Sequence, residues 1–66
     1  MQLYFYEGPV LEFERIVDER WRSTTRAESE KKARNNLAYQ FKMQTGRAPR
    51  SKIFIPGKLI IIEGDE

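Results

Sequence analysis

The chain has 66 residues, a formal net charge of +2, no cysteine and no histidine. A chain this short forms one domain with a small core, which argues against a deep enclosed active site. The missing residue types exclude a disulfide framework, a thiolate nucleophile, and the commonest general base and metal ligand. We therefore expect a single domain over residues 1–66, frayed from residue 62 onward, with no enzymatic activity, no cofactor and no metal site.

The N-terminus lacks a basic segment followed by an apolar one, which is the pattern of a signal peptide. The longest aliphatic run, Leu59–Ile62, is far shorter than the roughly 20 apolar residues that span a bilayer. We expect a soluble, cytoplasmic protein with no membrane partner.

Alternating side chains predict three strands in the first half of the chain. Residues 2–6 alternate in the strand pattern and are rich in aromatic side chains, and Gly8-Pro9 then breaks the pattern. Residues 10–17 and 20–28 alternate again, which predicts a second and a third strand.

A three-residue turn at Asp18–Arg20 would join the second strand to the third. It would place Glu12 opposite Arg26 on the outer face of the sheet. In the first strand, Leu3 and Phe5 lie on one face. Tyr4 and Tyr6 would lie on the other side, either as an exposed aromatic pair or covered in a two-sided sheet.

A helix is predicted from about Glu30 to Thr45. Ser29 is a favourable N-cap, because its hydroxyl can accept a hydrogen bond from an amide of the first turn, and Gly46 is a natural stop. The stripe that packs on the sheet recurs at helical spacing and consists of Ala33, Leu37 and Phe41.

Two short strands follow, at residues 53–55 and 59–62, joined through Pro56-Gly57. They are too apolar for an isolated edge, so they form either covered core, which we favour, or a dimer interface. The order strand-strand-strand-helix-strand-strand predicts an α+β fold: a small antiparallel sheet with one helix packed on one face.

Positive charge is concentrated in the middle of the chain. Residues 20–58 carry eleven of the twelve Lys and Arg residues and only two of the ten acidic ones. A basic block on a small domain is typical of a nucleic-acid-binding protein. We expect a nucleic-acid partner, DNA rather than RNA, bound mainly through phosphate contacts, and no small-molecule substrate.

Three groups of residues are candidate contacts. A helix face combines cations with an amide and a ring that can stack on a base: Lys31, Lys32, Asn35, Tyr39 and Lys42. The outer sheet face presents Arg22 and Arg26, which either read base edges or pair with Glu12 and Glu14. The loop after the helix supplies Arg47, Arg50 and Lys52, which can clamp a phosphate backbone. For each group the plainer interpretation is a solvated charged surface.

The segment from Trp21 to Lys42 resembles two families. Its run Ser29-Glu30-Lys31-Lys32-Ala33 is similar to the helix start of the N-terminal arm-type DNA-binding domain of tyrosine recombinases (integrases). That domain is a three-stranded sheet with a C-terminal helix, and its sheet lies in the DNA major groove. The resemblance implies that Arg22, Thr24 and Arg26 face DNA.

The run from Ser29 to Arg34 is also similar to the double-stranded-RNA-binding domain. In that family the lysines at the helix start touch phosphates, which would implicate Lys31, Lys32 and Arg34. The size and composition of the chain also resemble those of small phage or mobile-element proteins. The alternative function is a protein-interaction or structural module, in particular a homodimer formed through the C-terminal strands.

Overall fold

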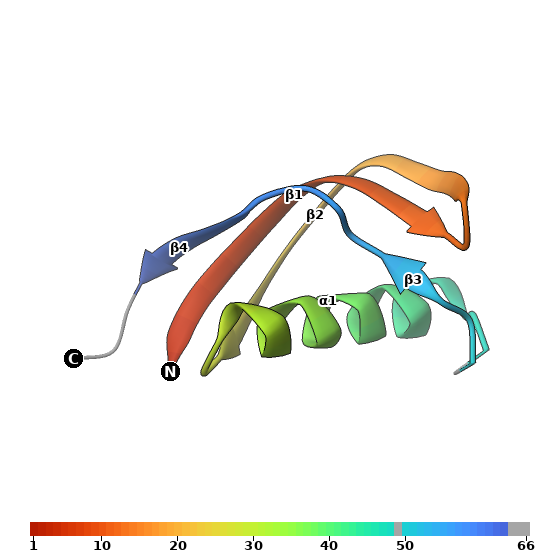
Figure 1. The fold of residues 1–66 in the computed structure, drawn as a ribbon. Helices are drawn as coiled ribbons and strands as arrows, with labels where there is room; N and C mark the ends of the chain where they lie inside the picture. The colour runs from red at the N-terminus through yellow and green to blue at the C-terminus, as the bar shows by residue number, and fades with distance from the viewer. Residues whose placement is uncertain (49, 64–66) are drawn as a thin grey trace.

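The structure is a computed structural model that describes residues 1–48 and 50–63. Its elements are β1 (Gln2–Glu12), β2 (Arg15–Ala27), α1 (Glu30–Thr45), β3 (Ile53–Phe54) and β4 (Leu59–Glu63). α1 lies across the concave face of a curved antiparallel sheet (Figure 1). The predicted α+β class, with one helix on one face of a small antiparallel sheet, is confirmed.

β1 is the central strand of the sheet. β2 pairs along one of its edges, while β3 and β4 share the other edge. β3 pairs with Leu11 and Glu12 near the end of β1, and β4 pairs with its first half, from Leu3 to Tyr6. Every strand of the sheet therefore takes its position from β1.

Two strands, rather than the three predicted, precede the helix. Gly8-Pro9 does not end a strand, because the register of β1 against β2 shifts on both sides of Val10 and this irregularity absorbs the proline. The hairpin turns at Phe13 and Glu14 instead of at Asp18–Arg20. The alternation of residues 10–17 thus belongs to both arms of one hairpin.

Because the observed turn lies at Phe13 and Glu14, the residues that face each other across the two strands differ from those predicted. Glu12 lies opposite Arg15, and Arg26 lies opposite Leu3, so the predicted pairing of Glu12 with Arg26 is wrong. Of the two interpretations of Tyr4 and Tyr6, the covered one is confirmed, since both side chains are buried, whereas Leu3 on the other face is only half-buried. Both faces of this strand carry large apolar groups, so alternation alone does not show which face the helix covers.

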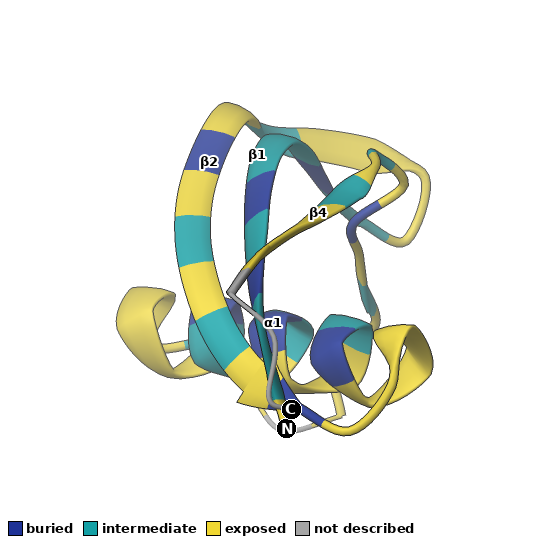
Figure 2. Cartoon of the chain, turned by 90° about the vertical axis from the view of Figure 1, so that its left-hand side faces the viewer, coloured by how far each residue is buried: buried dark blue, intermediate teal, exposed yellow. Residues whose placement is uncertain are grey.

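The core lies between α1 and the two long strands, where the buried positions face one another (Figure 2). The helix stripe of Ala33, Leu37 and Phe41 is buried, as predicted. The Trp21 and Phe41 rings meet edge to face, with centroids 5.3 Å apart and an interplanar angle of 86°. This T-shaped contact is a favourable aromatic arrangement and holds α1 on β2.

α1 begins and ends at the predicted residues. The Ser29 hydroxyl accepts a hydrogen bond from the Lys32 amide at 3.3 Å, and Gly46 adopts the left-handed conformation, with φ of 70°. No helix in the described part of the chain combines the length and the apolar character required to cross a membrane.

The hydroxyl of Tyr6 joins two distant parts of the chain. This fully buried side chain donates to the Pro9 carbonyl at 2.7 Å and accepts from the Gly57 amide at 3.0 Å. A Cβ atom at Gly57 would lie only 2.9 Å from the same oxygen, so a glycine is needed at this close approach. The bulge of β1 is thereby tied to the connection between β3 and β4.

The C-terminal strands divide between core and surface. Ile55 is buried, but Ile60, Ile61 and Ile62 are 51 to 54% exposed, so the prediction that this run is covered core is wrong for β4. β4 extends past the N-terminal end of α1, which therefore does not cover it (Figure 1). Of the predicted frayed tail, residues 62 and 63 belong to β4, and residues 64–66 lie outside the described residues.

Tyr6→Phe should lower the free energy of unfolding by about 1 to 3 kcal/mol. The substitution keeps the ring but leaves the Gly57 amide without its acceptor in a part-buried site. Urea denaturation followed by circular dichroism would measure the change. Tyr39→Phe, which removes the hydroxyl of an exposed ring, is the matched control and should stay within about 0.5 kcal/mol of the parent. Equal effects of the two substitutions would contradict this role of the Tyr6 hydroxyl.

Candidate nucleic-acid interface

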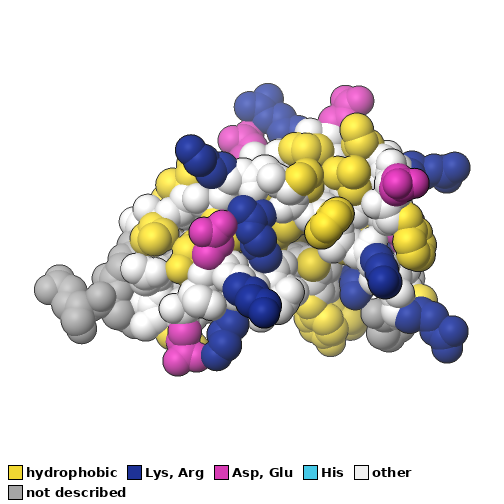
Figure 3. Space-filling model, in the orientation of Figure 1, with side chains coloured by type: hydrophobic (Ala, Val, Ile, Leu, Met, Phe, Trp, Pro, Cys, Tyr) yellow, Lys and Arg dark blue, Asp and Glu magenta, His cyan; other side chains and the backbone are white. Residues whose placement is uncertain are grey.

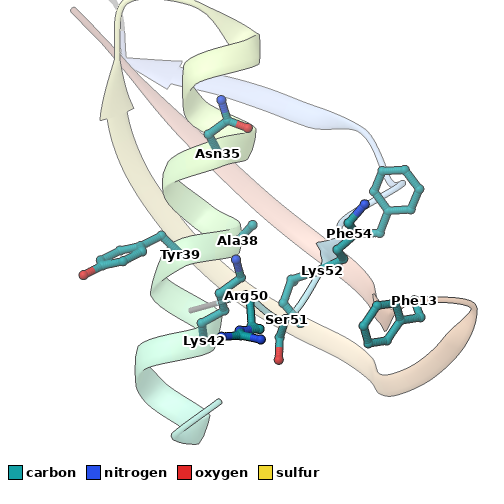
Figure 4. A pocket seen from close by; sticks show the side chains of 10 residues that line it. Phe13, Asn35, Ala38, Tyr39, Lys42, Arg50, Ser51, Lys52 and Phe54 are labelled. Atoms are coloured by element: carbon teal, nitrogen blue, oxygen red, sulfur yellow. The ribbon is translucent and has the colours of Figure 1, made fainter. Parts of the chain in front are cut away.

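A groove of about 590 Å³ lies between α1 and the segment that leads into β3. We call it the α1–β3 groove. The helix, the hairpin turn and the β3 segment all contribute to its lining, which consists of Phe13, Asn35, Ala38, Tyr39, Lys42, Arg50, Ser51, Lys52, Ile53 and Phe54 (Figure 4). Its volume is within the range that holds a small ligand or part of a larger one.

Three cations line the α1–β3 groove. Lys42 comes from α1, and Arg50 and Lys52 come from the segment before β3. No carboxylate is present among the described residues that line it. A concave surface with charges of one sign raises the local concentration of oppositely charged ligands. The α1–β3 groove is therefore suited to a polyanion.

Three aromatic rings accompany these cations. Phe13, Tyr39 and Phe54 are 63%, 60% and 68% exposed. Figure 4 shows Tyr39 on one side and the two phenylalanine rings on the other, with the Lys42 and Arg50 side chains between them. In the space-filling view, basic and hydrophobic side chains are interspersed, with some acidic ones among them, over the half of the molecule that contains β3 (Figure 3). This mixture of cations and ring faces is found where proteins hold nucleic-acid strands.

Phe13 has an unfavourable backbone conformation. Its φ of 60° makes it the one non-glycine residue in the described chain with a positive φ. For a bulky side chain this conformation costs about 1 to 2 kcal/mol. The amide of Phe13 donates to the Lys52 carbonyl at 3.0 Å, which fixes the hairpin turn against the segment before β3. Because the Phe13 ring is largely exposed, its burial contributes little stabilisation to offset this cost.

A second, adjoining hollow of about 400 Å³ extends the α1–β3 groove along the helix. The two share Asn35, Ala38, Ile53 and Phe54 among their lining residues, and the second adds Lys31 and Arg34. The Arg34 guanidinium donates to the Ile55 carbonyl at 2.6 Å and to Glu30 at 2.9 Å. Arg34 therefore fastens β3 to α1.

The α1–β3 groove and the adjoining hollow bring together six of the ten candidate contact residues. They are Lys31, Asn35, Tyr39, Lys42, Arg50 and Lys52. Phe13 and Phe54 were missed. The sequence prediction placed Phe13 inside the strand of residues 10–17 and not in a turn. Alternation could have identified Phe54, since its neighbours Ile53 and Ile55 both face the core.

Two other predicted residues have structural partners. The Lys32 ammonium donates to Glu28 at 2.8 Å. Arg47 is half-buried, with its guanidinium 5.2 Å from the centroid of the Phe41 ring and its Nε 3.3 Å from a Glu12 carboxylate oxygen. Arg47 stabilises the C-terminal end of the helix through a cation–π contact and a close ion pair.

Arg22 and Arg26 lie on the face of the sheet that points away from α1. Both are exposed and alternate with Trp21 and Ala27, which are buried under the helix. The predicted pairing of these arginines with Glu12 and Glu14 is wrong, since the hairpin turn lies elsewhere and Arg22 is opposite Glu7. This outer face is a second basic surface, separated from the α1–β3 groove by the sheet.

In comparisons of the chain with protein-family models, curated proteins and solved structures, nothing matches. The resemblances to the integrase arm-type domain and to the double-stranded-RNA-binding domain stay predictions. The described residues contain no group of three or more carboxylates, histidines or cysteines arranged to hold a metal ion.

Lys32→Gln should raise the pKa of Glu28. The hydrogen bond from the Lys32 ammonium, together with its charge, holds the Glu28 pKa below its ordinary value of 4.5. Because the folded pKa is lowered, this pair stabilises the fold at neutral pH, and the contribution is lost as the pH falls through the folded pKa. Carboxyl NMR titration would measure the shift. Lys31→Gln removes the same charge one residue earlier and should move the Glu28 pKa much less.

Proposed function

We propose that the chain is a nucleic-acid-binding module that acts mainly through phosphate contacts. The observation that supports this most directly is the α1–β3 groove, where Lys42, Arg50 and Lys52 gather with no carboxylate among the described lining residues. Phosphate neutralisation by Lys and Arg dominates nucleic-acid affinity and makes it fall with salt.

The cations of the groove contact phosphates in this proposal, and an amide between them contacts a base or a phosphate. Lys42, Arg50 and Lys52 contact phosphates in the α1–β3 groove, and Lys31 extends the contact along the helix. Asn35 lies where the two hollows meet, and its amide can donate to a base edge or a phosphate. The sheet separates Arg22 and Arg26 from this site, so these two arginines do not contribute phosphate contacts in this proposal.

Fluorescence anisotropy with labelled duplex DNA, single-stranded DNA and duplex RNA tests the proposal. At low salt we expect micromolar or tighter binding of at least one probe, with affinity falling steeply as salt rises. Arg50→Gln should weaken this binding and reduce the slope of log K against log salt by about one, as expected for one lost phosphate contact.

Arg22→Gln is the matched control, because it removes the same charge from the outer face of the sheet. Its salt slope should equal that of the parent if the α1–β3 groove holds the phosphates. If both variants lose the same affinity and salt dependence, the phosphate contacts are not confined to the α1–β3 groove, which contradicts the proposed site. No binding of any probe at low salt would overturn the proposed function.

A second candidate function is self-association through β4. This strand exposes Ile60, Ile61 and Ile62, and among the described residues it pairs only with β1, which leaves its other edge open. Open apolar edge strands are templates for pairing with another chain.

Sedimentation equilibrium of the parent chain should show a mass that rises with concentration if β4 associates. Ile60→Lys should then return the mass to that of the monomer. Met43→Lys places the same charge at an exposed apolar position of α1 and should leave association unchanged. A parent that stays monomeric at high concentration would exclude this function.

A further inference from the structure

We propose that the α1–β3 groove binds a single-stranded nucleic acid, with bases stacked on Phe13 and Phe54 and phosphates on Lys42, Arg50 and Lys52. The inference rests on the proposed function and names its ligand class. It also assigns a role to the two aromatic residues, Phe13 and Phe54, that the sequence prediction missed.

The exposed rings distinguish a single strand from a duplex. A duplex keeps its base faces stacked on one another and presents phosphates and groove edges to a protein. A single strand can unstack its bases and place them on aromatic side chains, and such stacking tolerates any base. Three rings that are each at least 60% exposed, beside three cations, match the single strand.

The backbone of Phe13 is the second observation. The turn between β1 and β2 has two residues, and its first holds a positive φ at which glycine is the unstrained choice. The Phe13 ring is exposed, so core packing does not explain why a phenylalanine occupies this position. Unfavourable backbone conformations persist where function uses the side chain that they position.

A hydrogen bond places this ring beside a phosphate-binding group. The Phe13 amide donates to the Lys52 carbonyl, so the stacking surface and a cation are held on adjoining backbone segments. Phe54 follows Lys52 by two residues and lines the same groove. A nucleotide whose base lies on one of these rings has its phosphate within reach of the neighbouring cation.

Anisotropy titrations with fluorescein-labelled 12-nucleotide oligothymidine and with a labelled 12-base-pair duplex test the inference. The parent should bind the single strand more tightly at equal salt. Phe54→Ala should weaken single-strand binding roughly 5- to 100-fold, the range expected for loss of one base–aromatic stack. Met43→Ala, which truncates an exposed apolar side chain of α1 outside the groove, should leave the affinity unchanged.

Phe13→Gly provides the sharper variant. It should weaken single-strand binding by a similar factor, while the melting temperature, followed by circular dichroism, stays unchanged or rises because glycine adopts the positive φ without strain. A purely structural role for Phe13 would instead lower the melting temperature and leave the affinity of the folded protein intact.

The outcomes separate this inference from the proposed function. Base stacking in the groove would be excluded if the duplex bound as tightly as the single strand or more tightly. It would also be excluded if both phenylalanine variants kept full affinity while Arg50→Gln bound weakly. In either case the proposed phosphate contacts would still stand. No binding of either probe at low salt would overturn both.

Discussion

The hydroxyl of Tyr6 is the contact on which the arrangement of this small domain depends. It lies in the middle of the central strand and bonds at once to the bulge of that strand and to the connection between β3 and β4. Glycines at positions 8 and 57 leave the space that the tyrosine ring and hydroxyl occupy. Since β3 makes only two register pairs with β1, this bond adds to the four register pairs of β4 in holding the C-terminal segment in place.

The position of β3 in turn creates the α1–β3 groove. Arg34 on α1 and the amide of Phe13 each bond to a carbonyl of the segment around β3, at Ile55 and Lys52. These two bonds hold the segment alongside the helix at a separation that leaves a hollow. The cations of α1 and of the loop, distant in sequence, then face the same space, whereas Arg47 is withdrawn from it to cover Phe41.

Sequence patterns predicted the helix with both caps, its buried stripe, the α+β class and most of the groove's cations, because these features depend on neighbouring residues. The sequence did not predict the course of the first two strands. A proline in the middle of a strand and a phenylalanine at a positive φ both violate local preferences. The hydrogen bonds that accompany them, from the Tyr6 hydroxyl to Pro9 and from Phe13 to Lys52, depend on the complete fold and are not visible in a local sequence pattern. Because the turn was misplaced, Phe13 was missed as a contact, whereas Phe54 was missed although the alternation of residues 53–55 indicates that its side chain is exposed.

The three walls of the groove belong to parts of the chain that meet only in the complete fold. The β1–β2 hairpin and α1 form through contacts between neighbouring segments. The third wall, residues 50–54, reaches Phe13 only after nearly forty residues of intervening chain have closed into a loop. A ligand held between these walls recognises the native state and not the unfolded one. Its binding is therefore thermodynamically linked to folding of the whole domain, and occupancy of the groove raises global stability in proportion to the logarithm of ligand concentration.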